Sequence, residues 1–206
     1  MRTDILDPQQ ESALALLKGN SEIGKFYLAG GTALALHLGH RYSEDFDFFT
    51  DQEFEVETLL SNLQQIGRCQ DIRKSPGTLF LKFDSILCSF ILYKYNLLEP
   101  AIVSLWGFGI VSIREIGAMK IMAIGGRGRR RDFIDLYFIA RDLGIENVWK
   151  DFEMKYAGSG YDHYHFLRAL TYFDDAEADI LPRMITPIEW KDVKRFFETE
   201  IKRITP

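Results

Sequence analysis

One stretch, residues 26–49, constrains the fold of this chain more than any other. Its apolar start predicts a buried strand, after which Gly30-Gly31 permits a tight turn that brings backbone N–H groups close to a ligand. Thr32 is expected to cap a helix over residues 33–39. The N-terminal end of such a helix favours an anion, so the sequence predicts a phosphate-binding turn.

The same stretch ends in two acids, in the order Asp45-Phe46-Asp47. Because alternate side chains of a strand share a face, we expect Asp45 and Asp47 to point the same way and Phe46 and Phe48 to face the core. Two carboxylates on one face can hold a hard cation such as Mg²⁺. A phosphate-binding turn upstream of paired carboxylates is typical of metal-assisted phosphoryl or nucleotidyl transfer.

The motifs of this stretch resemble the opening of the DNA polymerase beta-like nucleotidyltransferases, and specifically their AbiEii/AbiGii toxin branch. The resemblance implies that Gly30 and Gly31 hold a triphosphate and that Asp45 and Asp47 hold magnesium. It rests on three short motifs: Gly30-Gly31-Thr32, Arg41-Tyr42-Ser43 and Asp45-Phe46-Asp47. By the same implication Thr32, Arg41 and Ser43 belong to the nucleotide-binding residues.

Composition limits the class of protein. The 206 residues are 47% hydrophobic and 14% aromatic, which is ample for a packed core in one large or two small domains. The net charge of -5 argues against a generally basic nucleic-acid surface, so any RNA contact would need a local patch. Cys69 and Cys88 are too few for a disulfide framework. Without a signal peptide or a long apolar segment, we expect a soluble cytoplasmic protein with no membrane contact.

The order of expected elements predicts an α+β fold. Asp7-Pro8-Gln9-Gln10 opens a helix that ends near Lys18. A helix over 51–67, strands over 68–74, 78–83 and 86–93, and a loop with a short strand up to residue 111 indicate a mixed sheet flanked by helices. From the capping box at Ser112 onward we expect a helical bundle, with helices over 112–124, 131–142, 147–156, 161–172 and 186–203, the last starting at Thr186. We therefore expect an α/β nucleotidyltransferase core over 1–111 and a helical domain over 112–206 that completes the nucleotide cleft.

Charged residues in the second half form another candidate set. Lys120 falls in an apolar helical stripe, where it either faces a pocket or extends its ammonium to the rim. Asp135 stands among apolar residues and needs a partner, Arg131 or Lys120, either as a structural ion pair or in catalysis. The arginine-rich loop, residues 127–131, suits phosphates, although such a loop can also be a solvated surface.

The resemblance extends to this half. Lys120-Ile121-Met122-Ala123 and Arg131-Asp132-Phe133-Ile134-Asp135-Leu136 are similar to later motifs of the same toxin family, as is the acidic segment over 172–177. It implies that Lys120, Arg127 and Arg131 contact nucleotide phosphate and that Asp135 positions or deprotonates the acceptor. The alternative for the acidic segment is a solvated turn.

One position departs from the family pattern. The resemblance implies a third metal-binding carboxylate on a later strand, at the place of Ser89, whose hydroxyl lacks the charge that helps to hold two magnesium ions. Asp84 could replace it only if the hairpin turn before Ile86 directed its side chain inward, and Glu44 is out of phase with Asp45 and Asp47. A reduced site, or a protein that binds nucleotide without transferring it, therefore stays open.

Two functions from different classes follow. The first is a magnesium-dependent nucleotidyltransferase toxin that moves a nucleotide from an NTP to an acceptor hydroxyl, plausibly on tRNA or another RNA. The resemblance also implies a bacterial toxin-antitoxin system of phage defence, with a DNA-binding antitoxin as partner. The second function is a catalytically degenerate nucleotide-binding protein that acts through partners. A third option is a protein phosphotransferase.

Overall fold

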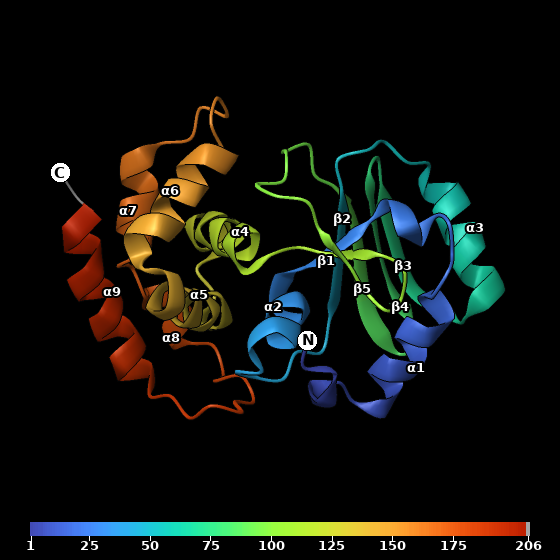
Figure 1. The fold of residues 1–206 in the computed structure, drawn as a ribbon, viewed down its shortest axis with the longest axis horizontal. Helices are drawn as coiled ribbons and strands as arrows, with labels where there is room; N and C mark the ends of the chain where they lie inside the picture. The colour runs from blue at the N-terminus through green and yellow to red at the C-terminus, as the bar shows by residue number, and fades with distance from the viewer. Residues whose placement is uncertain (205–206) are drawn as a thin grey trace. The chain divides into compact units, whose positions relative to one another are not determined.

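The structure is a computed structural model that describes residues 1–204, and its ribbon is drawn in Figure 1. The chain forms two compact units. Unit 1 consists of Met1–Leu38 and Tyr42–Ser112, and unit 2 consists of Gly39–Arg41 and the chain from Ile113 onward. The short segment Gly39–Arg41 thus belongs with the helical half, although the sequence placed it in the first domain. The part that unit 2 plays in a nucleotide cleft stays a prediction.

Within residues 1–204 unit 1 contains a sheet of seven strands in the order β3-β4-β5-β2-β1-β7-β6. The sheet is mixed, because β2 pairs in parallel with β5 and β1 with β7, while the other neighbours are antiparallel. This confirms the expected fold class. The strands are β1 (Tyr27–Ala29), β2 (Phe46–Thr50), β3 (Cys69–Ser75), β4 (Thr78–Phe83), β5 (Ile86–Leu92), β6 (Ile102–Val103) and β7 (Gly109–Ile110).

The helices of unit 1 are α1 (Pro8–Leu17), α2 (Gly30–Leu38) and α3 (Val56–Ile66), with short 3-10 turns at Thr3–Ile5 and Ile23–Lys25. The expected start of α1 is confirmed, since the Asp7 carboxylate accepts the Gln10 N–H at 2.8 Å in a complete capping box. The expected helix from residue 51 begins instead at Val56, after an extended Glu55.

The core of unit 1 lies between the sheet and the helices α1 and α3, which contact β5 and β3–β4 and lie on one side of the sheet in Figure 1. Phe46 and Phe48 are fully buried, as the alternation predicted. Phe48 stacks on Phe90 with ring centroids 5.0 Å apart. Strand β2 therefore keeps its odd-numbered side chains, Asp47 and Phe49, on the opposite and less buried face.

Unit 2 is helical in the described part of the chain, apart from one isolated bridge between Arg41 and Met184. The expected helix start at Thr186 is wrong, because the N–H groups of Ile185 and Thr186 donate to the carbonyl of His40 and the last helix begins at Trp190. The helices are α4 (Ile113–Arg127), α5 (Arg130–Leu143), α6 (Ile145–Lys155), α7 (His163–Ala169), α8 (Asp174–Glu177) and α9 (Trp190–Ile204). In residues 1–204 no helix has the length and apolar character that crossing a bilayer requires.

Candidate active site

Strand β1 runs directly into helix α2 at Gly30, which has a φ of +67°. A Cβ atom at Gly30 would overlap Oδ2 of Asp47 and lie 3.1 Å from its Cγ. Because Ala29 pairs with Asp47 across β1 and β2, the Asp47 carboxylate rests on the backbone at the start of α2. Glycine is therefore required at this position both by the backbone angle and by the acid that packs on it.

The first N–H groups of α2 belong to Gly30, Gly31 and Thr32, and they have no acceptor within the helix. The prediction that Thr32 caps the helix is wrong, since α2 begins two residues earlier. The Thr32 hydroxyl instead donates to the backbone carbonyl of Asp45 at 2.5 Å. This bond ties the first turn of α2 to the residue before β2 and brings the predicted phosphate-binding turn next to the predicted metal-binding acids.

Both acids lie near the first turn of α2, where the Asp47 carboxylate rests on Gly30 and the Asp45 carbonyl accepts the Thr32 hydroxyl. Asp47 lies in β2, and Asp45 immediately precedes the first residue of this strand. Burial raises the pKa of the Cys88 thiol, and the negative charges of Asp47 and Asp45 raise it further. Carboxylate oxygens are ligands that Mg²⁺ prefers, and a shared direction of the Asp45 and Asp47 side chains stays a prediction.

Ser89 is the direct β5 neighbour of Asp47 in the parallel pairing. Its hydroxyl donates to Oδ1 of Asp47 at 2.7 Å. Asp84 remains in the β4–β5 turn, where its carboxylate accepts the Arg68 N–H at 2.9 Å. Within residues 1–204 no group of three or more His, Cys, Asp or Glu side chains could hold a metal ion. A Mg²⁺ held by Asp45 and Asp47 stays a prediction, and such an ion would take its remaining ligands from water and substrate phosphates.

Asp135 is the centre of a buried ion network in unit 2. Its carboxylate is fully buried and receives His40 Nε2 at 2.8 Å, Arg41 Nε at 2.6 Å and Lys120 Nζ at 2.6 Å. Lys120 also contacts Asp132 at 2.8 Å. The contact between Lys120 and Asp135 is one of the two pairings that the sequence suggested, while the contacts of His40 and Arg41 with Asp135 were not predicted.

The charges in this network stabilise one another. Burial acts to raise the pKa of the Asp135 carboxyl, but Lys120 and Arg41 outweigh it and hold this pKa well below its ordinary value. Burial likewise acts to lower the pKa of Lys120, and the charges of Asp132 and Asp135 raise it overall. These contacts support the structural alternative for Lys120 and Asp135, and their catalytic roles stay a prediction.

The other predicted nucleotide-binding residues lie in different settings. Arg41 belongs to the ion network, and Ser43 offers its backbone carbonyl to Gln10 Nε2 at 2.6 Å. Arg127 donates to Asp132 at 2.9 Å, and Arg131 is exposed on α5. The neighbouring Arg129 and Arg130 bind Asp179 and the Ala176 carbonyl. Acids and carbonyls of unit 2 therefore engage much of the arginine-rich loop.

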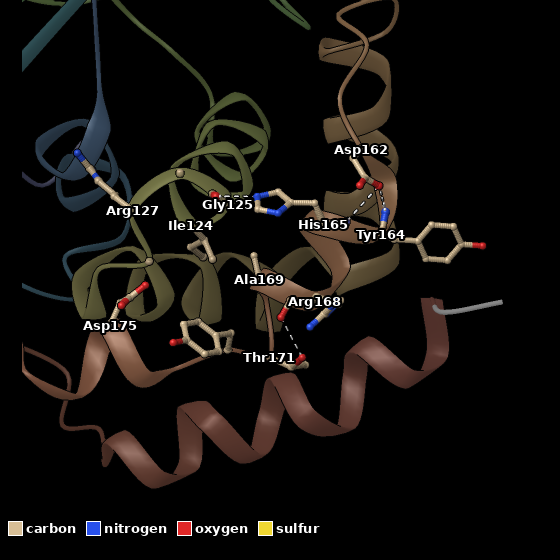
Figure 2. Close-up of a pocket in the computed structure, with 13 residues that line it drawn as sticks. Ile124, Gly125, Arg127, Asp162, Tyr164, His165, Arg168, Ala169, Thr171 and Asp175 are labelled. Carbon is tan, nitrogen blue, oxygen red and sulfur yellow. Dashed lines mark hydrogen bonds between the residues drawn. The ribbon is translucent and has the colours of Figure 1, made fainter.

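A pocket of about 710 Å³ lies beside this loop in unit 2, between Gly125–Gly128 and α7 (Figure 2). The His165 ring N–H donates to the Gly125 carbonyl at 2.8 Å, which joins α7 to the end of α4. Asp162 is occupied as the N-cap of α7, where it accepts the Tyr164 N–H at 2.9 Å. Neither Asp162 nor His165 was predicted to have a functional role.

The family model of the AbiEii toxin nucleotidyltransferases of type IV toxin-antitoxin systems matches residues 15–77 and 106–204, which is most of the chain. The chain belongs to the AbiEii nucleotidyltransferase toxin family. This confirms the resemblance seen in the short motifs, and the AbiEii-family protein is a nucleotidyltransferase of the toxin type.

Relatives of this AbiEii-family chain agree in length and fold. An uncharacterized protein of Aquifex aeolicus (strain VF5) is 35% identical over 202 residues, and the match covers 96% of each chain. An H. pylori protein assigned to the nucleotidyltransferases is 19% identical, with a TM-score of 0.55 over 97% of this chain and 96% of that one. MenT4, a nucleotidyltransferase toxin of Mycobacterium tuberculosis H37Rv, is 18% identical, with a TM-score of 0.56 over 94% and 82%. These two solved structures share the fold.

Proposed function

We propose that this AbiEii-family protein transfers a nucleotide from an NTP to an acceptor hydroxyl on RNA, such as a tRNA, with Mg²⁺ held by Asp45 and Asp47. The observation that carries the proposal is the position of the Asp47 carboxylate, which rests on Gly30 at the start of α2 and receives the Ser89 hydroxyl. The first N–H groups of α2, which have no acceptor within the helix, suit the triphosphate beside it. The same protein would act as a toxin that a DNA-binding antitoxin restrains.

The proposed step is an in-line displacement at the α-phosphorus of the NTP. The acceptor hydroxyl oxygen forms a bond to this phosphorus, the bond to the oxygen that bridges to the β-phosphate breaks, and pyrophosphate leaves with those electrons. The hydroxyl proton passes to water. Mg²⁺, when bound, neutralises the charge of the phosphates. Gly30 and Gly31 orient the triphosphate through their N–H groups, and Ser89 fixes the direction of the Asp47 carboxylate.

Residues of unit 2 enter the proposal separately. The family likeness implies that nucleotide phosphate is bound by four cations, Arg41, Lys120, Arg127 and Arg131. It implies the same role for Ser43 of unit 1, and it implies that Asp135 positions the acceptor. Lys120, Arg41 and Asp135 would first have to exchange contacts within the buried network. The Asp45–Asp47 site therefore carries the proposal, and these residues are its second part.

A second candidate is a protein that binds nucleotide and acts through a partner. The hydroxyl of Ser89 favours it, because a neutral donor replaces the negative charge that a third carboxylate would add beside Asp47. Such a protein would bind an NTP with Mg²⁺ and release no pyrophosphate.

The test is a transfer assay with each of the four α-labelled NTPs, Mg²⁺ and total tRNA, comparing the native chain with Asp47→Ala. Labelled RNA from the native chain alone supports the proposed enzyme. Nucleotide binding without labelled product supports the second candidate. Label on protein in place of RNA would instead indicate a protein acceptor, and equal labelling by both chains would remove the proposed site.

A further inference from the structure

A row of four side chains crosses the sheet of unit 1, beginning at the candidate active site. Asp47 on β2 pairs with Ser89 on β5, Ser89 pairs with Phe80 on β4, and Phe80 pairs with Arg73 on β3. Paired residues of neighbouring strands point to the same face. With strands about 4.8 Å apart, Phe80 lies about 10 Å from Asp47, and Arg73 about 14 Å.

Phe80 is unusual for an aromatic residue on an inner strand. Its neighbours on β4, Leu79 and Leu81, are buried against the core face, whereas 40% of Phe80 is exposed on the other face. Leu87, on the same face of β5, is 49% exposed. An apolar patch therefore continues the sheet face that carries the two acids.

Arg73 lies over the Phe80 ring, with its guanidinium carbon 5.9 Å from the ring centroid. In the described part of the chain no carboxylate forms an ion pair with Arg73, whereas the nearby Lys82 is paired with Asp71 at 2.7 Å. The row thus ends in an aromatic face and a planar cation, beside an acid, Asp71, that is paired with Lys82. Nucleic-acid bases and phosphates are recognised by this combination in single-stranded complexes.

We infer that Phe80 and Arg73 form a stacking platform for the terminal nucleotide of a single-stranded RNA acceptor. The inference rests on the proposed function. The triphosphate seat at Gly30 lies on the β1 side of Asp47, while Ser89 and Phe80 lie on its β5 side. In an in-line displacement the attacking hydroxyl approaches opposite to the leaving pyrophosphate. The acceptor therefore comes over β5 and β4, where its last base meets Phe80.

The chemistry of the row favours a nucleic acid over a protein acceptor. A nucleotide presents its flat base to Phe80 and its phosphate to Arg73, and the distance of about 10 Å between Phe80 and Asp47 is within reach of one nucleotide. Stacking on an aromatic ring tolerates any base, so the platform would bind an RNA end without reading its sequence. A serine or tyrosine hydroxyl on a folded protein brings no phosphate for Arg73.

The test uses a 5′-fluorescein-labelled single-stranded RNA with a free 3′-hydroxyl, measured by anisotropy against the full chain. In an Asp47→Asn background, Phe80→Ala and Arg73→Ala should each weaken RNA binding about tenfold, and Phe80→Trp should retain it. The matched control is Val103→Ala, which removes an apolar side chain with 76% exposure on the edge strand β6 and should leave binding unchanged. Thermal melts of each variant confirm that the chain is folded.

Activity then separates this inference from the proposed function. If the platform exists, Phe80→Ala raises the KM for RNA in the Asp47-intact chain and leaves the KM for NTP unchanged. Unchanged RNA binding by folded Phe80→Ala and Arg73→Ala chains overturns the platform even when RNA is still labelled. Absence of RNA labelling together with Phe80-dependent RNA binding would overturn the proposed reaction and leave the platform in place. Phe80-dependent labelling of a protein overturns the choice of RNA.

Discussion

The Ser89 hydroxyl donates a hydrogen bond of 2.7 Å to Oδ1 of Asp47, across the parallel pair β2–β5. This neutral donor stands where the family likeness expects a carboxylate. It holds the Asp47 side chain in place without adding a third negative charge. In the proposed site the negative charge for a metal would come from Asp45 and Asp47, so the proposed chemistry depends on how firmly these two acids are oriented.

Restoring an acid at position 89 should change the metal requirement. In Ser89→Asp a third carboxylate would lie beside Asp47, and the Mg²⁺ concentration for half-maximal transfer should fall several-fold because more negative charge holds the cation. Ser89→Ala, which only removes the hydrogen bond, should lower the transfer rate about tenfold. A magnesium titration of the transfer rate measures both. An unchanged magnesium dependence in Ser89→Asp would contradict the assigned position.

Gly30→Ala should damage the site more than the fold. The added methyl group would overlap the Asp47 carboxylate at a φ of +67°, so we expect a loss of stability of about 1–3 kcal/mol and a fall in transfer rate of at least about a hundredfold. Gly24→Ala is the control, since its Cβ would meet nothing within 4 Å. Urea unfolding and the transfer assay measure the two effects. A fully active Gly30→Ala chain would rule out the contact between Gly30 and Asp47.

Lys120→Met should destabilise unit 2 strongly. It leaves Asp132 and Asp135 buried with one cation fewer, which typically costs about 3–5 kcal/mol. Lys194→Met removes a partly exposed partner of Glu177 and should cost less than about 1 kcal/mol. Urea unfolding compares them. Should Lys120→Met keep its stability and lose NTP binding, the predicted phosphate contact would replace the structural interpretation.

Acid should destabilise the chain through Asp132 and Asp135. Burial acts to raise the pKa of both carboxyls, but neighbouring cations, including Lys120, hold it below the ordinary value. An unfolded aspartate has a pKa of about 3.9, so near pH 4 the unfolded chain binds more protons than the folded one. Their contribution to the free energy of unfolding is therefore present above this pH and is lost as the pH falls further.

Urea unfolding between pH 3 and 7 measures this dependence. Asp132→Asn should reduce the loss of unfolding free energy at low pH. Asp192→Asn, which alters a partly exposed acid of α9, should leave that loss unchanged. An identical loss of unfolding free energy at low pH in the native and Asp132→Asn chains would show that the buried ion network does not set the acid sensitivity.

Local patterns in the sequence predicted much of unit 1. The alternation over Asp45–Phe48 placed Phe46 and Phe48 in the core, and the capping pattern at Asp7 located α1. These features depend on neighbours within a few residues, so they are visible in the sequence. The start of α2 was misplaced because Thr32 is a good capping residue, whereas its hydroxyl is used by the distant carbonyl of Asp45.

Long-range pairing could not be predicted in the same way. Periodicity shows which face a residue occupies, but not that β5 lies between β2 and β4, and the row from Asp47 to Arg73 exists only through that order. Arg129 and Asp179 are 50 residues apart in the sequence, so the loop was interpreted as phosphate-binding or solvated without its acidic partner. The ion contacts of His40 and Arg41 with Asp135 likewise join segments over 90 residues apart.

The central claim is that the Asp47 carboxylate serves nucleotide transfer. It is tested most directly by the initial rate of α-labelled NTP incorporation into tRNA with Mg²⁺, for the native chain, Asp47→Asn and Glu44→Gln. Glu44 is an exposed acid of the same segment and serves as the matched control. We expect the native and Glu44→Gln chains to label RNA at equal rates and Asp47→Asn to be at least about a hundredfold slower. Labelling by Asp47→Asn at the native rate would contradict the account.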